Sequence, residues 1–237
     1  MSVSDLAAVK LFVWSAGRPL VRVHSSAYGA TEPHPGPEAV AGLLWPRTRF
    51  AHFRPTPRHR WVATLYGGQD DVAGLSETVF HTVPALGGPE RRPSKVLARR
   101  YLAHMLSSVA ATRDLSLIDL TPAGLDALGL AEADVIMSPS STYPDTTALA
   151  RRLYVDAVAA DGLVWRSRQQ PDRLAVALWF ATTRWAAADR GAGLVRADLR
   201  VVDSPQPLLA DDGMRRLLRA GNALDVTVVP PEARRPR

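Results

Sequence analysis

Residues Trp61 to His81, WVATLYGGQDDVAGLSETVFH, contain the change of pattern that decides the fold. The stretch begins with aromatic and β-branched residues that are typical of a strand, and Gly67-Gly68 marks the end of that strand. Asp70 or Asp71 can then cap a helix by accepting bonds from its first free N–H groups. The apolar residues that follow recur every three or four positions, which predicts one apolar helix face made of Val72, Leu75, Val79 and Val83.

Glu77 lies on a different side of this predicted helix from the apolar face, together with Ala73 and His81. A glutamate just beyond a strand that ends in a tyrosine and two glycines has the setting of a site residue. The ordinary alternative is a solvated glutamate on a surface helix, because charged side chains are mostly exposed. The stretch alone leaves both interpretations open.

The length and composition are those of a globular protein. A chain of 237 residues, 46% of them hydrophobic and 22% charged, can bury a sizeable core. It contains no cysteine, which excludes disulfides and thiolate-held metal sites and fits a reducing cytoplasm. The first residues lack the pattern of a signal peptide, and the longest apolar run, residues 174–188, is interrupted by two threonines and an arginine. We therefore expect a cytoplasmic protein without a membrane-spanning segment.

The formal net charge of +6 suggests a polyanionic partner, but the distribution of the charge weakens that idea. Of the 29 basic residues only Lys10 and Lys95 are lysines, and the other 27 are arginines scattered along the chain. Because scattered charge does not form the basic stripe of a nucleic-acid binder, direct nucleic-acid binding is disfavoured. A need for a few arginines that hold the phosphates of a small ligand fits the composition equally well.

Short strands and helices are expected along the rest of the chain. The expected strands are residues 19–24, 115–120, 163–167, 174–182 and 194–202, and the expected helices are residues 94–109, 122–128 and 146–160. Residues 27–47 are expected to be a long loop with room for a helical turn at 38–44. No repeat or linker divides the chain, which predicts a single α+β domain over residues 18–205, with mixed or antiparallel sheets and surrounding helices. Residues 1–17 are predicted to be a lead-in, and residues 206–237 a C-terminal extension with a basic tail.

Several familiar chemistries leave no signature in the sequence. There is no GxxxxGK[ST] phosphate loop, no GxGxxG after a strand and no HExxH. The six histidines are scattered, so we expect no metal site. The segment from Gly74 to Thr78 lacks the second glycine of a nucleophile elbow, which argues against a serine hydrolase.

A set of dispersed segments resembles the RES-domain family, which is named for its arginine, glutamate and serine. The segments are RVH, RF, LYGGQDDVAGLSETVFH, LSLIDLTPAGLDALGL, YPDTTALARRLY and DGLVWRSR, and together they cover roughly residues 18–185. The resemblance implies a fold akin to that of ADP-ribosyltransferases and an activity on NAD. Characterised relatives are toxins of bacterial toxin–antitoxin pairs that break NAD at the nicotinamide–ribose bond, in some cases by phosphorolysis. Their partners are antitoxins with an Xre-type helix-turn-helix part.

Carried over residue by residue, the resemblance implies catalytic roles for Glu77, Arg22 and Ser167. The residues that it implies for NAD binding are Arg22, Arg49, Tyr66 and Ser167. A proline-rich insertion precedes Arg49, so Arg47 or Arg54 is an alternative for the second arginine. NAD is then a substrate rather than a cofactor, and inorganic phosphate is a candidate co-substrate.

These residue types suit the implied chemistry on physical grounds. Arginine forks bind a pyrophosphate through charge-assisted bonds, and the face of a tyrosine attracts the nicotinamide cation. A carboxylate can stabilise the oxocarbenium-like sugar that remains when nicotinamide departs. Two alternatives stay open, namely an ADP-ribosyltransferase that modifies a protein target and a catalytically silent binding protein.

Overall fold

A computed structural model of the chain describes residues 8–36, 48–83, 93–156, 160–180 and 194–231. Within these residues eight strands form one mixed sheet in the order β1-β6-β7-β8-β3-β2-β5-β9. Their bounds are β1 (Leu11–Trp14), β2 (Pro19–Ser25), β3 (Ala63–Gly68), β5 (His104–Ala111), β6 (Leu115–Asp119), β7 (Gly162–Arg166), β8 (Leu174–Phe180) and β9 (Leu199–Pro207). Two further strands, β4 (Ser94–Val96) and β10 (Thr227–Val229), pair in parallel as a small second sheet.

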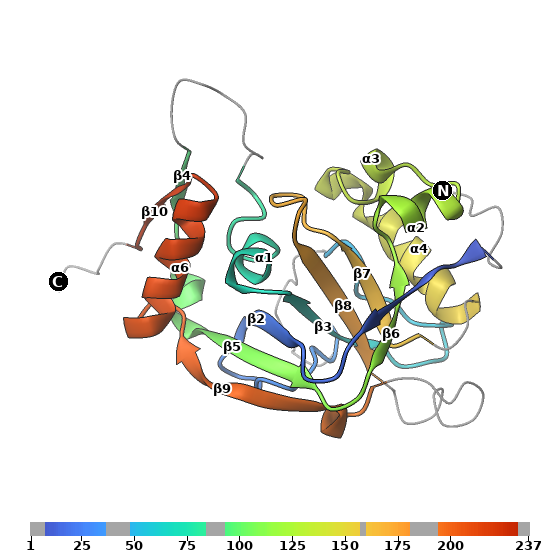
Figure 1. Ribbon diagram of the computed structural model, residues 1–237, viewed down its shortest axis with the longest axis horizontal. Helices are drawn as coiled ribbons and strands as arrows, with labels where there is room; N and C mark the ends of the chain where they lie inside the picture. The colour runs from blue at the N-terminus through green and yellow to red at the C-terminus, as the bar shows by residue number, and fades with distance from the viewer. Residues whose placement is uncertain (1–7, 37–47, 84–92, 157–159, 181–193, 232–237) are drawn as a thin grey trace.

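Helices cover the large sheet at both of its ends. The α-helices are α1 (Asp71–Ser76), α2 (Pro122–Ala127), α3 (Glu132–Val135), α4 (Tyr143–Asp156) and α6 (Asp211–Ala223), and the 3-10 turns are η3 (Arg99–Ala103), η4 (Ser140–Thr142) and η5 (Arg196–Asp198). Figure 1 shows α1 and α6 beside the β2, β5 and β9 end of the sheet, and α2, α3 and α4 beside the β6 and β7 end. The predicted α+β class is confirmed, whereas kinship with the ADP-ribosyltransferase fold stays a prediction.

The side chains of β3 alternate between two apolar clusters. Leu65 packs with Leu20 and Leu178 in one cluster, while Tyr66 packs against the cluster that contains Trp165 and Trp179. This is the period of two that a strand imposes, since successive side chains point to opposite faces of the sheet. Tyr66 and Trp165 therefore lie on the same face, and they are on the face that α2 and α4 cover.

Two glycines allow α1 to lie directly on the strands below it. A Cβ at Gly68 would come within 2.3 Å of the backbone nitrogen of Gly74, and a Cβ at Gly74 would come within 2.6 Å of the carbonyl oxygen of Val21. Any larger residue at either position would push the helix away from β2 and β3. Asp70 caps the helix as predicted, because its carboxylate accepts a 3.0 Å bond from the Ala73 N–H group.

Most of the elements predicted from the sequence are confirmed. Strands occur at β2, β6, β7 and β8, and helices at α2 and α4, close to the expected bounds. The strand expected at 194–202 begins only at Leu199, and the helix expected from Val72 to Val83 ends at Ser76, although Val79 and Val83 are buried as expected. The helical turn expected at 38–44 lies outside the described residues.

The helix predicted at residues 94–109 is wrong. This segment forms β4, the turn η3 and most of β5, which pairs with β2 on one side and with β9 on the other. Apolar residues at every fourth position fit the period of a helix and also the period of two of a strand. Pairing with the two neighbouring strands therefore decided that the segment forms a strand. The predicted lead-in contains β1, which pairs with β6, and the predicted border at 205/206 falls within β9, ahead of α6.

Candidate active site

Glu77 is the residue at which α1 ends, and its side chain is partly exposed. Its backbone N–H group bonds to the carbonyl of Ala73, which fixes the residue as the helix cap. Burial is the largest influence on its carboxyl group and raises the pKa, while Ser167 and Arg49 act in the opposite direction. Burial thus disfavours the charge of this carboxylate, and the polar groups around it favour that charge.

Ser167 and Trp165 approach this carboxylate from the end of β7. Both side chains are almost completely buried, each with 1% of its surface exposed. They lie close enough to Glu77 to lower its pKa, yet neither the Ser167 Oγ nor the Trp165 Nε1 reaches the distance and angle of a full hydrogen bond with any described residue. Two buried polar atoms beside a carboxylate therefore retain capacity to bond a ligand.

Tyr66 presents its ring next to the same group. Its hydroxyl accepts a 3.0 Å bond from the Phe50 N–H group and donates to the Thr48 hydroxyl, while its ring meets that of Trp165 edge to face at 6.1 Å. Burial is the main cause that raises the Tyr66 pKa above its ordinary value, so the phenol stays neutral. A neutral, fixed aromatic ring suits contact with a flat cation.

Arg49 is held by neutral acceptors, with 9% of its surface exposed. Its Nη1 donates to the Val135 carbonyl at 2.6 Å and to the Ser138 hydroxyl at 2.7 Å, and its guanidinium lies 5.1 Å from the centre of the Tyr143 ring. Burial lowers the Arg49 pKa, and Glu77 is among the groups that raise it. Arg49 thus lies in the neighbourhood of the carboxylate.

Arg168 and His81 complete the arrangement, and Arg168 is a residue that the sequence analysis did not single out. The Nη2 of Arg168 donates to the His81 carbonyl at 2.9 Å, and the His81 ring bonds the Tyr143 hydroxyl through Nε2 at 3.0 Å. Arg168 lowers the pKa of His81 and of Glu77, so its charge lies near both. In the sequence, the one sign that Arg168 belongs to the site is that it directly follows Ser167. We call the following residues the Glu77 cluster: Arg49, Tyr66, Glu77, Trp165, Ser167 and Arg168.

A comparison with protein-family models now bears on this cluster. The model described as the RES domain matches residues 19–201, which is most of the chain and includes every member of the cluster. The chain belongs to the RES-domain family. RES domains are associated with NAD-related toxin function. Searches of curated proteins and of solved structures found no match for the chain.

Arg22 is the predicted site residue that the structure does not join to the Glu77 cluster. In this RES domain β2 and β3 pair only at Val21 and Gly68 and then diverge, and the carbonyls of Ala30 and Glu32 accept bonds from the Arg22 Nη1 at 2.9 and 2.8 Å. Burial lowers the Arg22 pKa to about 10, and the charge that opposes this is that of Glu32. Arg22 thus anchors the segment that fills the gap between the two strands.

The two alternatives to Arg49 have different outcomes. Arg47 lies outside the described residues. The guanidinium of Arg54 lies 4.6 Å from the centre of the Trp61 ring and donates to the Pro57 carbonyl. Neither of these contacts involves Glu77. Of the described candidates, Arg49 is the arginine whose charge acts on the carboxylate.

The described residues of the RES domain offer neither a metal site nor a membrane-spanning helix. In that part of the chain, no group of three or more His, Asp or Glu side chains is arranged to hold a metal ion. Within the same residues, no helix combines the length and the apolar character that a membrane crossing requires. The chemistry considered below uses only the side chains of the Glu77 cluster.

Proposed function

We propose that this RES domain consumes NAD by cleaving the bond between nicotinamide and ribose. The observation that supports this most directly is a carboxylate, Glu77, with a buried serine hydroxyl and two arginine charges around it. Family membership supports the substrate class. The proposal goes further than either observation, because it names the bond and the roles of the residues.

Binding of NAD would use the charge and the rings of the cluster. Arg49 would hold the pyrophosphate through charge-assisted bonds, and the rings of Tyr66 and Trp165 would contact the nicotinamide cation. The Ser167 hydroxyl would bond the ribose or the carboxamide, since its Oγ has no complete bond within the described residues. Arg22 would act on this site by fixing the segment between β2 and β3.

Cleavage would pass through a sugar that carries positive charge. The carbon–nitrogen bond breaks with its electron pair on nicotinamide, which leaves as a neutral molecule, and Glu77 stabilises the cationic ribose. A new carbon–oxygen bond then forms with water or phosphate. Water loses one proton in this step, and the Glu77 carboxylate can accept it, since burial raises its pKa above the ordinary glutamate value. No resident cofactor is required by this sequence of steps.

The decisive experiment is to incubate the purified protein with NAD, with and without inorganic phosphate, and to resolve the products by chromatography. Release of nicotinamide is the expected result. ADP-ribose as the second product would indicate hydrolysis, and a phosphorylated ADP-ribose formed only with phosphate would indicate phosphorolysis. Intact NAD under both conditions would contradict the proposal.

We infer in addition that the enzyme is the toxin of a toxin–antitoxin pair in the cytoplasm, where its substrate occurs. A cell that makes an enzyme that consumes NAD must silence it, and the family resemblance suggests a protein with an Xre-type helix-turn-helix part as the partner. Expression alone should stop growth, and co-expression of such a neighbouring protein should restore it. Harmless expression of a protein that degrades NAD in vitro would refute the toxin role and leave the enzymatic proposal intact.

A further inference from the structure

The arginines of this protein fall into two groups according to what they bind. Three arginines, of which Arg113 is exposed and Arg173 and Arg216 are partly buried, are paired with carboxylates, in the pairs Arg113–Asp161, Arg173–Asp70 and Arg216–Asp71. Arg49 and Arg168 are also withdrawn from solvent, but among the described residues neither has a carboxylate oxygen within ion-pair distance. Their hydrogen-bond acceptors are neutral carbonyls and one hydroxyl. Such arginines keep their charge available for another anion.

A continuous set of contacts joins these two arginines. The guanidinium of Arg49 lies over the Tyr143 ring, the Tyr143 hydroxyl bonds the His81 ring, and the His81 carbonyl accepts from Arg168. Neighbouring Gln169 fastens the same turn, because its amide donates to the Val83 carbonyl at 2.6 Å. The turn that carries Arg168 is therefore fixed to the segment that follows Glu77.

The charge balance at this place is positive. Glu77 is the carboxylate whose pKa both Arg49 and Arg168 lower, so two cations face one anion. Each guanidinium has five N–H donors, and the bonds described for Arg168 use only one of them. The buried Ser167 hydroxyl, which precedes Arg168, adds one more group without a complete bond among the described residues.

We propose that Arg49 and Arg168 form an oxyanion-binding site beside Glu77 that takes a phosphate group, either free inorganic phosphate or the pyrophosphate of NAD. Paired N–H donors of a guanidinium match two oxygens of such an anion, and a net positive site favours a doubly charged group. The second source rests on the proposed function, whereas binding of free phosphate does not. The assignment gives Arg168 a role in binding that extends the predicted set of site residues.

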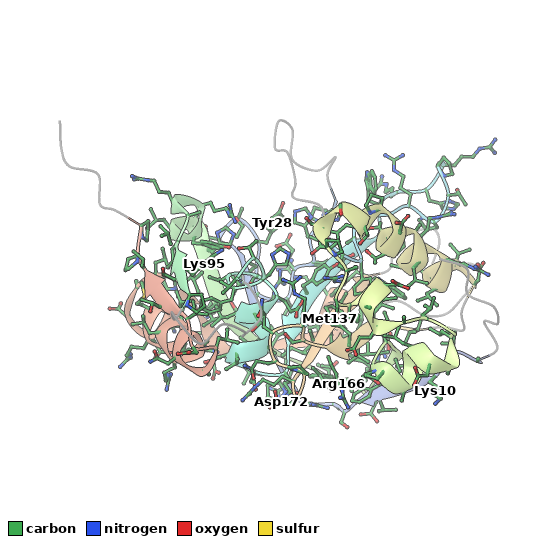
Figure 2. The ribbon with its side chains drawn as sticks, turned by 90° about the horizontal axis from the view of Figure 1, so that it is seen from above. Lys10, Tyr28, Lys95, Met137, Arg166 and Asp172 are labelled. Atoms are coloured by element: carbon green, nitrogen blue, oxygen red, sulfur yellow. The ribbon has the colours of Figure 1, made fainter. Side chains whose placement is uncertain are left out.

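The first test measures binding of inorganic phosphate by calorimetry to the wild-type protein and to three variants. Arg168→Gln should weaken binding about ten- to a hundredfold, the loss expected for a charge-assisted hydrogen bond. Arg168→Lys keeps the positive charge but lacks the paired N–H donors of a guanidinium, so its phosphate affinity should lie between those of the wild type and Arg168→Gln. Arg166→Gln is the matched control, because Arg166, which is labelled in Figure 2, is an exposed arginine at the end of β7.

The second test separates the two sources of the anion. NAD affinity is measured by calorimetry in a Glu77→Gln background, which limits turnover, with and without the Arg168 changes. A site for free phosphate predicts weaker phosphate binding with NAD affinity unchanged. A site for the pyrophosphate predicts weaker NAD binding, and competition between phosphate and NAD. Thermal melting of each variant shows that it is folded, and Arg168→Lys serves if Arg168→Gln does not fold.

Two results would overturn the proposal. One is wild-type affinity for both phosphate and NAD in a folded Arg168→Gln or Arg168→Lys variant. The other is an equal loss in the Arg166→Gln control, which would indicate general attraction rather than a site. A protein that binds phosphate through Arg168 but leaves NAD intact would contradict the proposed function and support this site, so the two failures are distinguishable.

Discussion

Replacing Glu77 by glutamine tests the centre of the site with the smallest change in shape. Burial is the largest cause of the raised pKa of this carboxyl group, so the folded protein holds the charge at a cost. Glutamine removes that cost and also the charge that faces Arg49 and Arg168. Because the two effects oppose each other, and the backbone bond from residue 77 to Ala73 is kept, we expect the free energy of unfolding to change by under about 1 kcal/mol.

Turnover should respond far more strongly than stability. The carboxylate is proposed to face a ribose that becomes cationic only in the transition state, so its charge matters most at that point. Loss of one such electrostatic partner commonly lowers the turnover number by about a hundredfold or more, which corresponds to roughly 3 kcal/mol. NAD affinity should stay within a few-fold of wild type, since the pyrophosphate contacts are unchanged. This division between turnover and binding locates the effect in the transition state.

The assay is release of nicotinamide, followed by chromatography at saturating NAD, together with calorimetric NAD binding and thermal unfolding. Asp134→Asn is the control, because Asp134 is an exposed carboxylate on α3 and the change is again from carboxylate to amide. Wild-type turnover in Glu77→Gln would refute the assignment of Glu77. Equal losses of turnover and of stability would refute the reasoning that separates them.

Further expected outcomes concern pH and arginines. Lowering the pH should reduce NAD turnover with a midpoint above the ordinary glutamate pKa, because burial raises the pKa of Glu77; a pH–rate profile checks this. Arg49→Ala should weaken NAD binding by about 1.5–3 kcal/mol and Arg49→Lys by less, as measured by calorimetry; unchanged affinity would exclude Arg49 from binding. Arg22→Ala should lower the free energy of unfolding by about 1–3 kcal/mol in urea titrations, because two carbonyls lose their donor; an unchanged midpoint would contradict the anchoring role. Burial lowers the pKa values of His24, His34 and His52 to about 4, whereas unfolded histidine titrates near about 6.5. The unfolded state then binds more protons between these values, so stability should fall as pH drops from about 6.5 to 4; a flat urea midpoint would refute this.

The helices and strands that were predicted correctly have apolar residues that follow one period, and they have clear capping or turn residues at their ends. The helix α2 follows Thr121-Pro122, and the hairpin of β7 and β8 follows from two apolar runs around a polar turn. The helix prediction for residues 94–109 was wrong because the pairing of β5 with β2 and β9 is a long-range property, which a short window of the sequence does not contain. The same limit explains why β1 was missed, since its partner β6 lies about a hundred residues along the chain.

The structure brings some of the expected site residues together and not others, and the difference has a physical reason. Glu77, Tyr66 and Ser167 lie at the ends of regular elements, so their approach to one another follows once those elements pack. Arg168 needed the structure, because its role depends on the carbonyl of His81, which belongs to a distant turn. Arg22 has its expected strand position, but only the divergence of β2 and β3 reveals that its donors go to Ala30 and Glu32.

The placement of Glu77 is unfavourable for folding on several counts, and this is an argument for its function. A carboxylate at the C-terminal end of a helix meets the negative end of the helix dipole, and burial adds the cost of removing its charge from water. A residue selected only for stability would be apolar or an amide at this position. Ser167, Arg49 and Arg168 offset the cost in part by lowering the pKa, and they come from two regions of the chain, one distant in sequence from Glu77 and the other separated from it by β3. Groups that converge from such distances on one disfavoured charge are expected where that charge performs chemistry, because proteins retain destabilising arrangements mainly at functional sites.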